Sequence, residues 1–326
     1  MAGVKADQLS LYVKDMYKVS RESYKEIPTM HDKIFKVVNG VTGAGDKSTQ
    51  ILGVGRLERH LVEGQNIKFK SPIEGWSYLV RYWTYSDGIA LTKEAVEDTV
   101  KLGNLIKELA ATWGKQVRIC EETMAATVFN KGGDLLGEWV FNGSHTGNAA
   151  TYGDMLYDNK PLFCLTGNKW TTKGGGTYYN SVAGLTLNPA NFETLYVLHT
   201  ATNNRDERDE IVANPVDTLL TKVGADAFLA DRLLNTERGI PGQQLNDSNP
   251  YYKIVSALAW DYLSDTSSPF YLGKAQSDML QFHKRQAPEI RFFRDEDNRG
   301  YKASIDVRQG VLVKGRSWTR GGGTSA

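Results

Sequence analysis

Cysteine is scarce in this chain of 326 residues, and neither sign of charge is in excess. The two cysteines, Cys120 and Cys164, lie far apart and form no Cys-x-x-Cys pair, which disfavours a disulfide framework and fits a reducing compartment. We expect both to be buried for structural reasons. The chain has 39 lysines and arginines against 38 aspartates and glutamates, a net charge of +1. It therefore lacks the basic field that binding of nucleic acid through its phosphates requires.

Long apolar runs are absent as well. No stretch approaches the roughly 20 residues of a membrane span, and the start Met-Ala-Gly-Val-Lys lacks the features of a signal peptide. We expect a cytosolic, soluble product with no membrane partner. With 40% hydrophobic and 24% charged residues, the chain can bury a sizeable core in one or two domains.

Motifs for catalysis or for a bound cofactor fall short. Residues 40–48 resemble a phosphate-binding loop, but Asp46 stands where glycine must precede the lysine. Residues 295–306 approach a calcium loop, but Arg299 replaces an oxygen ligand. The five histidines are scattered without metal-ligand spacing. The sequence predicts no catalytic residue, no metal site and no cofactor.

A strand rich in aromatic residues is present. Residues 51–63 and 76–85 are predicted to form a hairpin joined through a polar tip. Trp76, Tyr78 and Tyr82 alternate with residues that include Trp83, so apolar groups occur on both faces of one strand. A two-stranded hairpin is marginal alone and exposes too much apolar surface. Two interpretations stay open: a core sheet of the same chain covers the aromatic residues, or a neighbouring molecule does.

The strongest periodic signal runs from Thr92 to about residue 130. Apolar residues recur there at three- and four-residue steps, which predicts one long amphipathic helix that could bend at Gly103 or Gly114. A coiled coil explains the pattern poorly, because sustained charges beside a heptad seam are absent. A long helix lying across a flat domain explains it better.

The remaining segments give coarser predictions. Residues 1–50 show no sustained period and predict an extended arm with one short helix, and residues 131–188 predict loops and short strands. Helices are expected after two Asn-Pro pairs, at Pro189 and at Pro215, the second one preceded by a strand at 211–213. Alternation over residues 301–307 predicts a further strand.

The last quarter of the chain has a distinctive order of aromatic residues, prolines and strands. Residues 262–272 (Tyr-Leu-Ser-Asp-Thr-Ser-Ser-Pro-Phe-Tyr-Leu) are followed by Phe282 and Pro288, then by Tyr301-Lys302-Ala303 and Trp318-Thr319-Arg320-Gly321. This order resembles the C-terminal part of tailed-phage major capsid proteins with the Hong Kong 97-type fold, which include the Mu-type head subunits. The similarity is more specific after Thr186 and looser before it.

The resemblance implies an α+β fold in five parts. These are an N-terminal arm (1–50), an extended hairpin loop (51–91), a peripheral domain with a spine helix (92–200), an axial domain (201–289), and return strands of the peripheral domain with a flexible tail (290–326). In the family the hairpin reaches over an adjacent subunit, which would explain the two-faced aromatic strand. Assembly contacts are therefore expected at Lys68, Lys70, Trp76, Tyr78, Tyr82 and Trp83.

The resemblance also implies a structural protein that is not an enzyme. Copies of the chain would assemble into pentamers and hexamers and form the icosahedral head shell around phage double-stranded DNA. The expected location is the virion, after assembly in the host cytoplasm. Expected partners are the chain itself, portal and scaffolding proteins, decoration proteins, and packaged DNA that is held without sequence-specific binding.

Some relatives join an arm lysine covalently to an asparagine of a neighbouring subunit, with help from a buried glutamate. Lys68 and Lys70 match the lysine by position, but the other two positions fall on or near Lys302 and Gln309. We therefore expect no such cross-link.

Other functions stay open as alternatives. One is a compartment shell of the encapsulin kind, which would hold protein cargo. Another is a soluble hydrolase that uses dispersed carboxylates such as Glu121, Glu122 and Asp154, although no spacing supports it. A tail or adhesion protein is the third.

Overall fold

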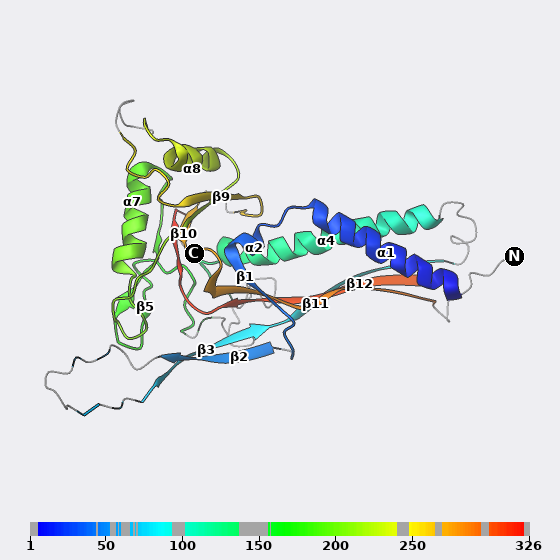
Figure 1. Cartoon of the computed structure of the whole chain (residues 1–326), viewed down its shortest axis with the longest axis horizontal. Coiled ribbons are helices and arrows are strands. Elements are labelled where there is room, and N and C mark those ends of the chain that lie inside the picture. The colour runs from blue at the N-terminus through cyan, green and yellow to red at the C-terminus, as the bar shows by residue number, and fades with distance from the viewer. Residues whose placement is uncertain are drawn as a thin grey trace.

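The computed structural model describes residues 6–43, 45–52, 57, 59, 66–67, 69, 71–92, 102–136, 156, 158–239, 248–264, 269–294 and 300–322. Two larger sheets organise this part of the chain. A four-stranded sheet of order β1-β11-β12-β4 carries the helices α1 and α4, and a five-stranded sheet of order β7-β13-β10-β8-β9 lies beside α7 and α8 (Figure 1). The ribbon of β2 and β3 runs along the opposite side from α1 and α4.

The bounds of these elements are as follows. The helices are α1 (Ala6–Glu26), α2 (His31–Ile34), α4 (Leu102–Asn130), α7 (Pro189–Val197), the π-helix η1 (Leu198–Thr202) and α8 (Ala225–Asn235). The strands are β1 (Phe35–Asn39), β2 (Gly45–Leu52), β3 (Ile73–Arg81), β4 (Trp83–Leu91), β5 (Trp170–Thr171), β6 (Thr177–Tyr178), β7 (Ser181–Val182), β8 (Thr218–Lys222), β9 (Ser256–Trp260), β10 (Phe270–Gly273), β11 (Ser277–Arg294), β12 (Tyr301–Val313) and β13 (Trp318–Gly321).

The two longest strands, β11 and β12, form the backbone of the four-stranded sheet. They pair antiparallel from Leu280 and Val313 to Arg294 and Tyr301, with bulges around Gln286 where Pro288 lies nearby. A bulge accommodates proline, which has no N–H to give to a ladder. Along β12, Ala303, Ile305 and Val307 are buried at alternate positions against α1 and α4. The strand predicted at 301–307 is confirmed.

The prediction for residues 1–50 is wrong in its main element. Instead of an arm with one short helix, α1 is a helix of 21 residues that packs along α4 (Figure 1). Met16 is fully buried and packs with Trp113 and Val117 of α4. Most residues of α1 are polar, and only a narrow apolar stripe packs on α4. Such a narrow stripe gives a weak periodic signal in the sequence.

Gly114 allows α1 and α4 to approach closely. A Cβ placed on Gly114 would collide with the carbonyl oxygen of Ser20 on α1. We expect Gly114→Ala to lower the free energy of unfolding by about 1–3 kcal/mol, because overpacking outweighs the better helix propensity of alanine. Urea denaturation of the full chain would measure this. Gly167→Ala is the control, since no atom lies within 4 Å of a Cβ at that position; equal stability of the two variants would contradict the prediction.

The helix α4 joins the two halves of the core. Its first half packs with α1 on β11 and β12, and its second half reaches the main hydrophobic cluster, where Phe129 contacts Trp260, Tyr271 and Trp318 edge to face. The long helix predicted from periodicity is confirmed over residues 102–130, a length of roughly 43 Å at the usual rise. Residues 93–101, where that prediction begins, lie outside the described part.

Of the two helices expected after Asn-Pro pairs, one is confirmed. The Asn188 side chain caps α7 by accepting a hydrogen bond from Asn191 N, and Pro189 starts the helix. The second prediction is wrong, because residues 218–222 form the strand β8 and the helix α8 begins only at Ala225. Leu219 and Leu220 are both fully buried because both faces of the five-stranded sheet are covered: Leu219 packs in a cluster with Phe192, and Leu220 packs in the main core with Trp260. A run of apolar residues there therefore marks a strand.

The hairpin also differs from its predicted bounds. The paired strands are β2 and β3, whereas β4 leaves the hairpin and pairs with β12 through nine residue pairs, from Leu91 with Tyr301 to Trp83 with Gln309. The predicted boundary between the axial domain (201–289) and the return strands (290–326) falls inside the single strand β11. At the C-terminus, β13 pairs with β10 and β7 in the five-stranded sheet.

Cys164 is fully buried as expected, whereas Cys120 is only partly buried; both are free thiols. Burial raises the pKa of Cys120 to about 11. Among the helices of the described residues, none is both long and apolar enough to cross a membrane.

Candidate functional site

Tyr78 and Tyr82, two of the six expected contact residues, are covered by their own chain. Each is 4% exposed, and they pack with Val80 and Leu312 in a small hydrophobic cluster. The Tyr78 hydroxyl donates to Gln50 Oε1 at 2.6 Å, and the Tyr82 hydroxyl lies 2.9 Å from His283 Nδ1. The interpretation in which the same chain covers the aromatic strand therefore holds for these two residues.

The two tryptophans lie on different strands, Trp76 within β3 and Trp83 at the start of β4. Trp76 Nε1 donates to Glu207 Oε2 at 3.0 Å, and Lys173 Nζ lies 5.0 Å from the centre of its ring. Trp83 is half-buried and packs against the main hydrophobic core. Lys68 and Lys70 lie outside the described residues. A role of Trp76, Trp83 and the two lysines in contacts between subunits stays a prediction.

The end of the β2–β3 ribbon at Leu52 and Ile73 is bound to Lys173 and to a charged loop at residues 205–210. Besides the bond to Trp76, Arg208 Nη2 donates to Leu52 O at 3.4 Å, and Lys173 Nζ donates to the carbonyl oxygens of Glu74 and Gly75. Asp209 in turn accepts hydrogen bonds from Thr172, Gly176 N and Tyr178. These polar contacts fix the direction in which the hairpin leaves the body of the chain.

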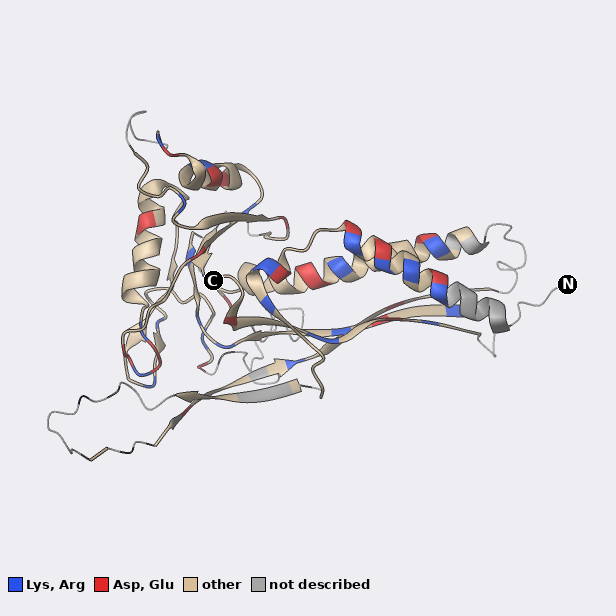
Figure 2. Cartoon of the chain, in the orientation of Figure 1, with Lys and Arg blue, Asp and Glu red and all other residues tan. Residues whose placement is uncertain are grey.

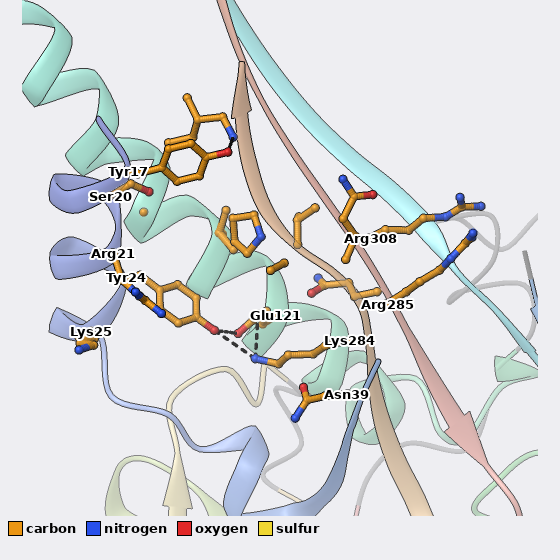
Figure 3. A pocket seen from close by; sticks show the side chains of 18 of the residues that line it. Tyr17, Ser20, Arg21, Tyr24, Lys25, Asn39, Glu121, Lys284, Arg285 and Arg308 are labelled. Atoms are coloured by element: carbon orange, nitrogen blue, oxygen red, sulfur yellow. Dashed lines mark hydrogen bonds and ion pairs between the residues drawn. The ribbon is translucent and has the colours of Figure 1, made fainter. Parts of the chain in front are cut away.

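The carboxylates considered for hydrolysis have structural partners. Glu121 accepts a hydrogen bond from Tyr24 at 2.7 Å and forms an ion pair with Lys284 at 2.9 Å (Figure 3). It also forms an ion pair with Arg118 at 3.0 Å. Burial and this carboxylate raise the pKa of Tyr24 well above its ordinary value. Glu122 is fully buried and joins α4 to α2 and β9, while Asp154 lies outside the described residues.

Within the described residues, no cluster of three or more His, Cys, Asp and Glu side chains could hold a metal ion. Each carboxylate oxygen of Glu121 and Glu122 accepts a hydrogen bond from a residue of another helix, strand or loop. The two side chains therefore connect elements of the fold.

The arrangement of the sheets, the long helix and the hairpin matches known structures. A chain in the capsid of cyanophage P-SCSP1u aligns with a TM-score of 0.53 at 7% sequence identity, over 91% of this chain and 89% of that chain. A chain of the mature capsid of bacteriophage PhiM1 aligns with a TM-score of 0.53 at 8% identity, over 90% of this chain and 87% of that chain. The chain has the Hong Kong 97-type capsid fold.

Sequence comparison adds nothing to this structural similarity. No protein-family model matches the sequence, and no curated protein matches it either. A virus-like particle from Pyrococcus furiosus aligns with a TM-score of 0.46 at 9% identity, over 95% of this chain and 98% of that chain, which is too weak to distinguish between kinds of shell. The finer prediction of a Mu-type subunit stays a prediction.

In this Hong Kong 97-type chain, the outer part of the hairpin exposes apolar side chains. Leu57 and Phe69 are 95% and 94% exposed, and Ile51 and Ile67 are 72% and 66% exposed. The sequence analysis missed them because it treated this part of the hairpin as a polar tip. The signal was present in Ile67-Lys68-Phe69-Lys70, where apolar and charged residues alternate as they do in a half-covered strand. A soluble monomer rarely exposes such a group of apolar side chains.

Proposed function

We propose that this chain is a major capsid protein whose copies assemble into pentamers and hexamers and form the icosahedral head shell around phage double-stranded DNA. The exposed apolar side chains of the hairpin carry this proposal: Ile51, Leu57, Ile67 and Phe69. Burying large apolar side chains is the main favourable term in association, and a neighbouring subunit would cover these. The fold supports the proposal because the similar chains belong to phage capsids.

In this proposal the described parts have distinct mechanical roles. The helix α4 is the spine of the peripheral domain, β11 and β12 extend it, and the five-stranded sheet with α7 and α8 forms the axial domain that meets its copies at capsomer centres. The hairpin on β2 and β3 reaches a neighbouring subunit. Strength then comes from many ordinary contacts repeated by symmetry, and no catalysis is required.

Packaged DNA would be enclosed without sequence-specific binding. In the described parts of α1 and α4, lysine and arginine are interspersed with aspartate and glutamate (Figure 2), and the whole chain has a net charge of only +1, so it lacks the strong basic field that phosphate binding needs. We propose the virion as the location of the protein, with portal, scaffolding and decoration proteins as partners in assembly.

Removing the apolar side chains of the hairpin tests this function. We expect the double variant Leu57→Ser, Phe69→Ser to remain folded and to assemble only at a concentration at least about a hundredfold higher, because each buried side chain contributes about 1.5–3 kcal/mol. Sedimentation and negative-stain electron microscopy would compare it with the native chain, expressed alone and with the products of neighbouring genes.

Ile119→Ser is the matched control, because Ile119 is an exposed apolar residue on α4, a helix to which the proposal assigns no contact between subunits. Closed shells, tubes or capsomers from the native chain are the expected result. A native chain that stays monomeric with all its partners would contradict the proposed function, and protein cargo inside a closed particle would favour a compartment shell.

A further inference from the structure

A cavity of about 820 Å³ lies between α1, α4 and the strands β11 and β12, beside the point where β1 ends at Asn39. This volume is typical of a ligand site. None of the assembly contacts proposed above uses it. Its lining combines helix residues such as Tyr17 and Tyr24 with strand residues such as Lys284 and Arg308 (Figure 3). Gln309 of β12 also belongs to the lining.

Cationic side chains predominate in this lining. Two glutamates, Glu22 and Glu121, face six lysines and arginines, although the whole chain has a net charge of only +1. Glu121 is already paired with Arg118 and Lys284. The other five cations are Lys18, Arg21, Lys25, Arg285 and Arg308. A cleft lined by one sign of charge concentrates ligands of the opposite sign.

The arginines stand on different sides of the cavity. Arg21 lies on α1, whereas Arg285 and Arg308 extend side by side from β11 and β12, away from α1 (Figure 3). Arg21 and Arg285 pair with no carboxylate among the residues that the structure describes, and Arg308 Nε donates only to the backbone oxygen of Tyr82, at 3.4 Å. A single small anion could not serve both sides, but an extended ligand with several anionic groups could.

Two buried polar atoms in the lining lack a partner within the described chain. Gln309 is fully buried, and its Oε1 accepts no hydrogen bond although its Nε2 lies 3.5 Å from Cys120 Sγ. Arg285 Nη1 is buried and donates none. Each unsatisfied buried group costs about 1–3 kcal/mol. A ligand that offers both an N–H donor and anionic oxygens would satisfy both.

We propose that this cavity binds an extended acidic peptide segment of a second protein. Its carboxylates would pair with Arg21, Arg285 and Arg308, whose planar guanidinium groups match carboxylate geometry. A backbone N–H of the peptide would donate to Gln309 Oε1. The inference rests on the proposed function only in identifying the partner as a protein that takes part in shell assembly.

A peptide fits this cavity better than nucleic acid does. Val117, Ile290 and Val307 give it apolar walls that suit aliphatic side chains, and a phosphodiester backbone offers no N–H for Gln309. Addition of a strand to the edge of β11 is disfavoured, because Pro288 and the nearby bulges interrupt the ladder. Recognition would therefore depend on side chains.

A separate protein is a better source of the segment than another copy of this chain. The run Asp295-Glu296-Asp297 is flanked by Arg294 and Arg299, which cancel much of its charge. In the other acidic run, at residues 205–210, Asp206 and Asp209 already accept hydrogen bonds from their own loop and its surroundings.

Fluorescence anisotropy on the unassembled full chain tests the proposal. The probe is a labelled hexapeptide of alternating glutamate and leucine, compared with the same peptide carrying glutamine for glutamate. We expect the acidic peptide to bind at least about tenfold more tightly, because charge-assisted hydrogen bonds are the stronger class. Arg285→Glu and Arg21→Glu should each weaken its binding about tenfold, and Arg21, being exposed on α1, gives a second variant should Arg285→Glu misfold.

Arg232→Glu is the matched control, since Arg232 is exposed on α8 outside the cavity and should leave binding unchanged. Equal binding of the two peptides, or of all the variants, would overturn the proposal. Displacement of the probe by single-stranded or duplex DNA at a lower concentration than by unlabelled acidic peptide would also overturn it. If the chain forms shells but does not bind the peptide, only this inference is contradicted. If it binds the peptide but forms no shells, only the proposed function is contradicted.

Discussion

Replacing Glu122 by leucine is expected to lower the free energy of unfolding by about 3–5 kcal/mol, because several buried hydrogen-bond donors would lose their acceptor. The Glu122 carboxylate is fully buried and accepts from His31 Nδ1 at 2.7 Å, Met30 N at 2.9 Å and Trp260 Nε1 at 2.9 Å. The variant would leave all three donors unsatisfied inside the core. Because they belong to the start of α2 and to β9, the loss would loosen both from α4.

Glu108→Leu on the same helix is the control. Glu108 is exposed, so its replacement should change stability by less than about 0.5 kcal/mol. Urea denaturation of both variants and the native chain measures the difference. A loss below about 1 kcal/mol in Glu122→Leu would show that the carboxylate does not hold these elements together.

The same carboxylate should make stability depend on pH in the acid range. Burial alone would raise the pKa of Glu122, but the hydrogen bonds from His31, Met30 and Trp260 outweigh burial and lower it below the ordinary value of 4.5. A depressed pKa means that the stabilisation is present above pH 4.5 and is lost as the pH falls through the folded-state pKa. Glu122→Gln should therefore flatten the decline of stability below pH 4.5 relative to the native chain.

Lowering the pH from 7 to 4 is expected to destabilise the chain by about 3 kcal/mol through His199 alone. This side chain is 1% exposed in the π-helix η1, and burial lowers its pKa from 6.5 to about 4. Its Nε2 has no hydrogen-bond partner in the described structure, and its Nδ1 lies 3.4 Å from Thr319 Oγ1. The folded state thus keeps the ring neutral while the unfolded chain gains a proton below pH 6.5, so stability falls between pH 6.5 and 4.

His199→Gln should remove this part of the pH dependence, whatever its effect on stability at pH 7. Denaturation curves at several pH values would show the change in slope, and NMR titration of the imidazole would follow the ring directly. A ring that gains its proton near pH 6.5 in the folded chain would refute the prediction.

Several elements were predictable because their signals are local. The Asn188-Pro189 pair holds both the cap and the first residue of α7 within a few positions. The alternation of Ala303, Ile305 and Val307 reports one buried face of β12, and the stripe along α4 reports one buried face of a helix. In each case a short run of the chain carries the whole pattern.

Other elements depend on contacts between distant residues. The helix α1 gains its stability by packing against Gly114 and Trp113, about a hundred positions away. In β8, Leu219 and Leu220 are apolar at consecutive positions, which is also compatible with a helix; in the folded chain they pack into two different hydrophobic clusters, because both faces of the sheet are covered. Propensity alone could not decide between these outcomes.

The candidate site shows the same division. Sequence reasoning found the aromatic strand but could not tell that Leu312 covers Tyr78 and Tyr82, because that contact spans more than two hundred positions. It also noted Glu121 and Glu122 without their partners Lys284 and Trp260. The exposed Leu57 and Phe69 were overlooked, since exposure of an apolar residue depends on what the rest of the chain leaves uncovered.

The sequence by itself determined the near-neutral charge, the long α4, the capped α7, the strand β12 and the order of motifs that indicates a capsid fold. Only the tertiary structure decided that α1 is a helix, that β4 joins β12, and that the cations from α1, β11 and β12 line one cavity. Local periodicity is encoded within a few turns of chain. Burial, pairing and local charge instead depend on which distant residues folding brings together, and those contacts exist only in the folded molecule.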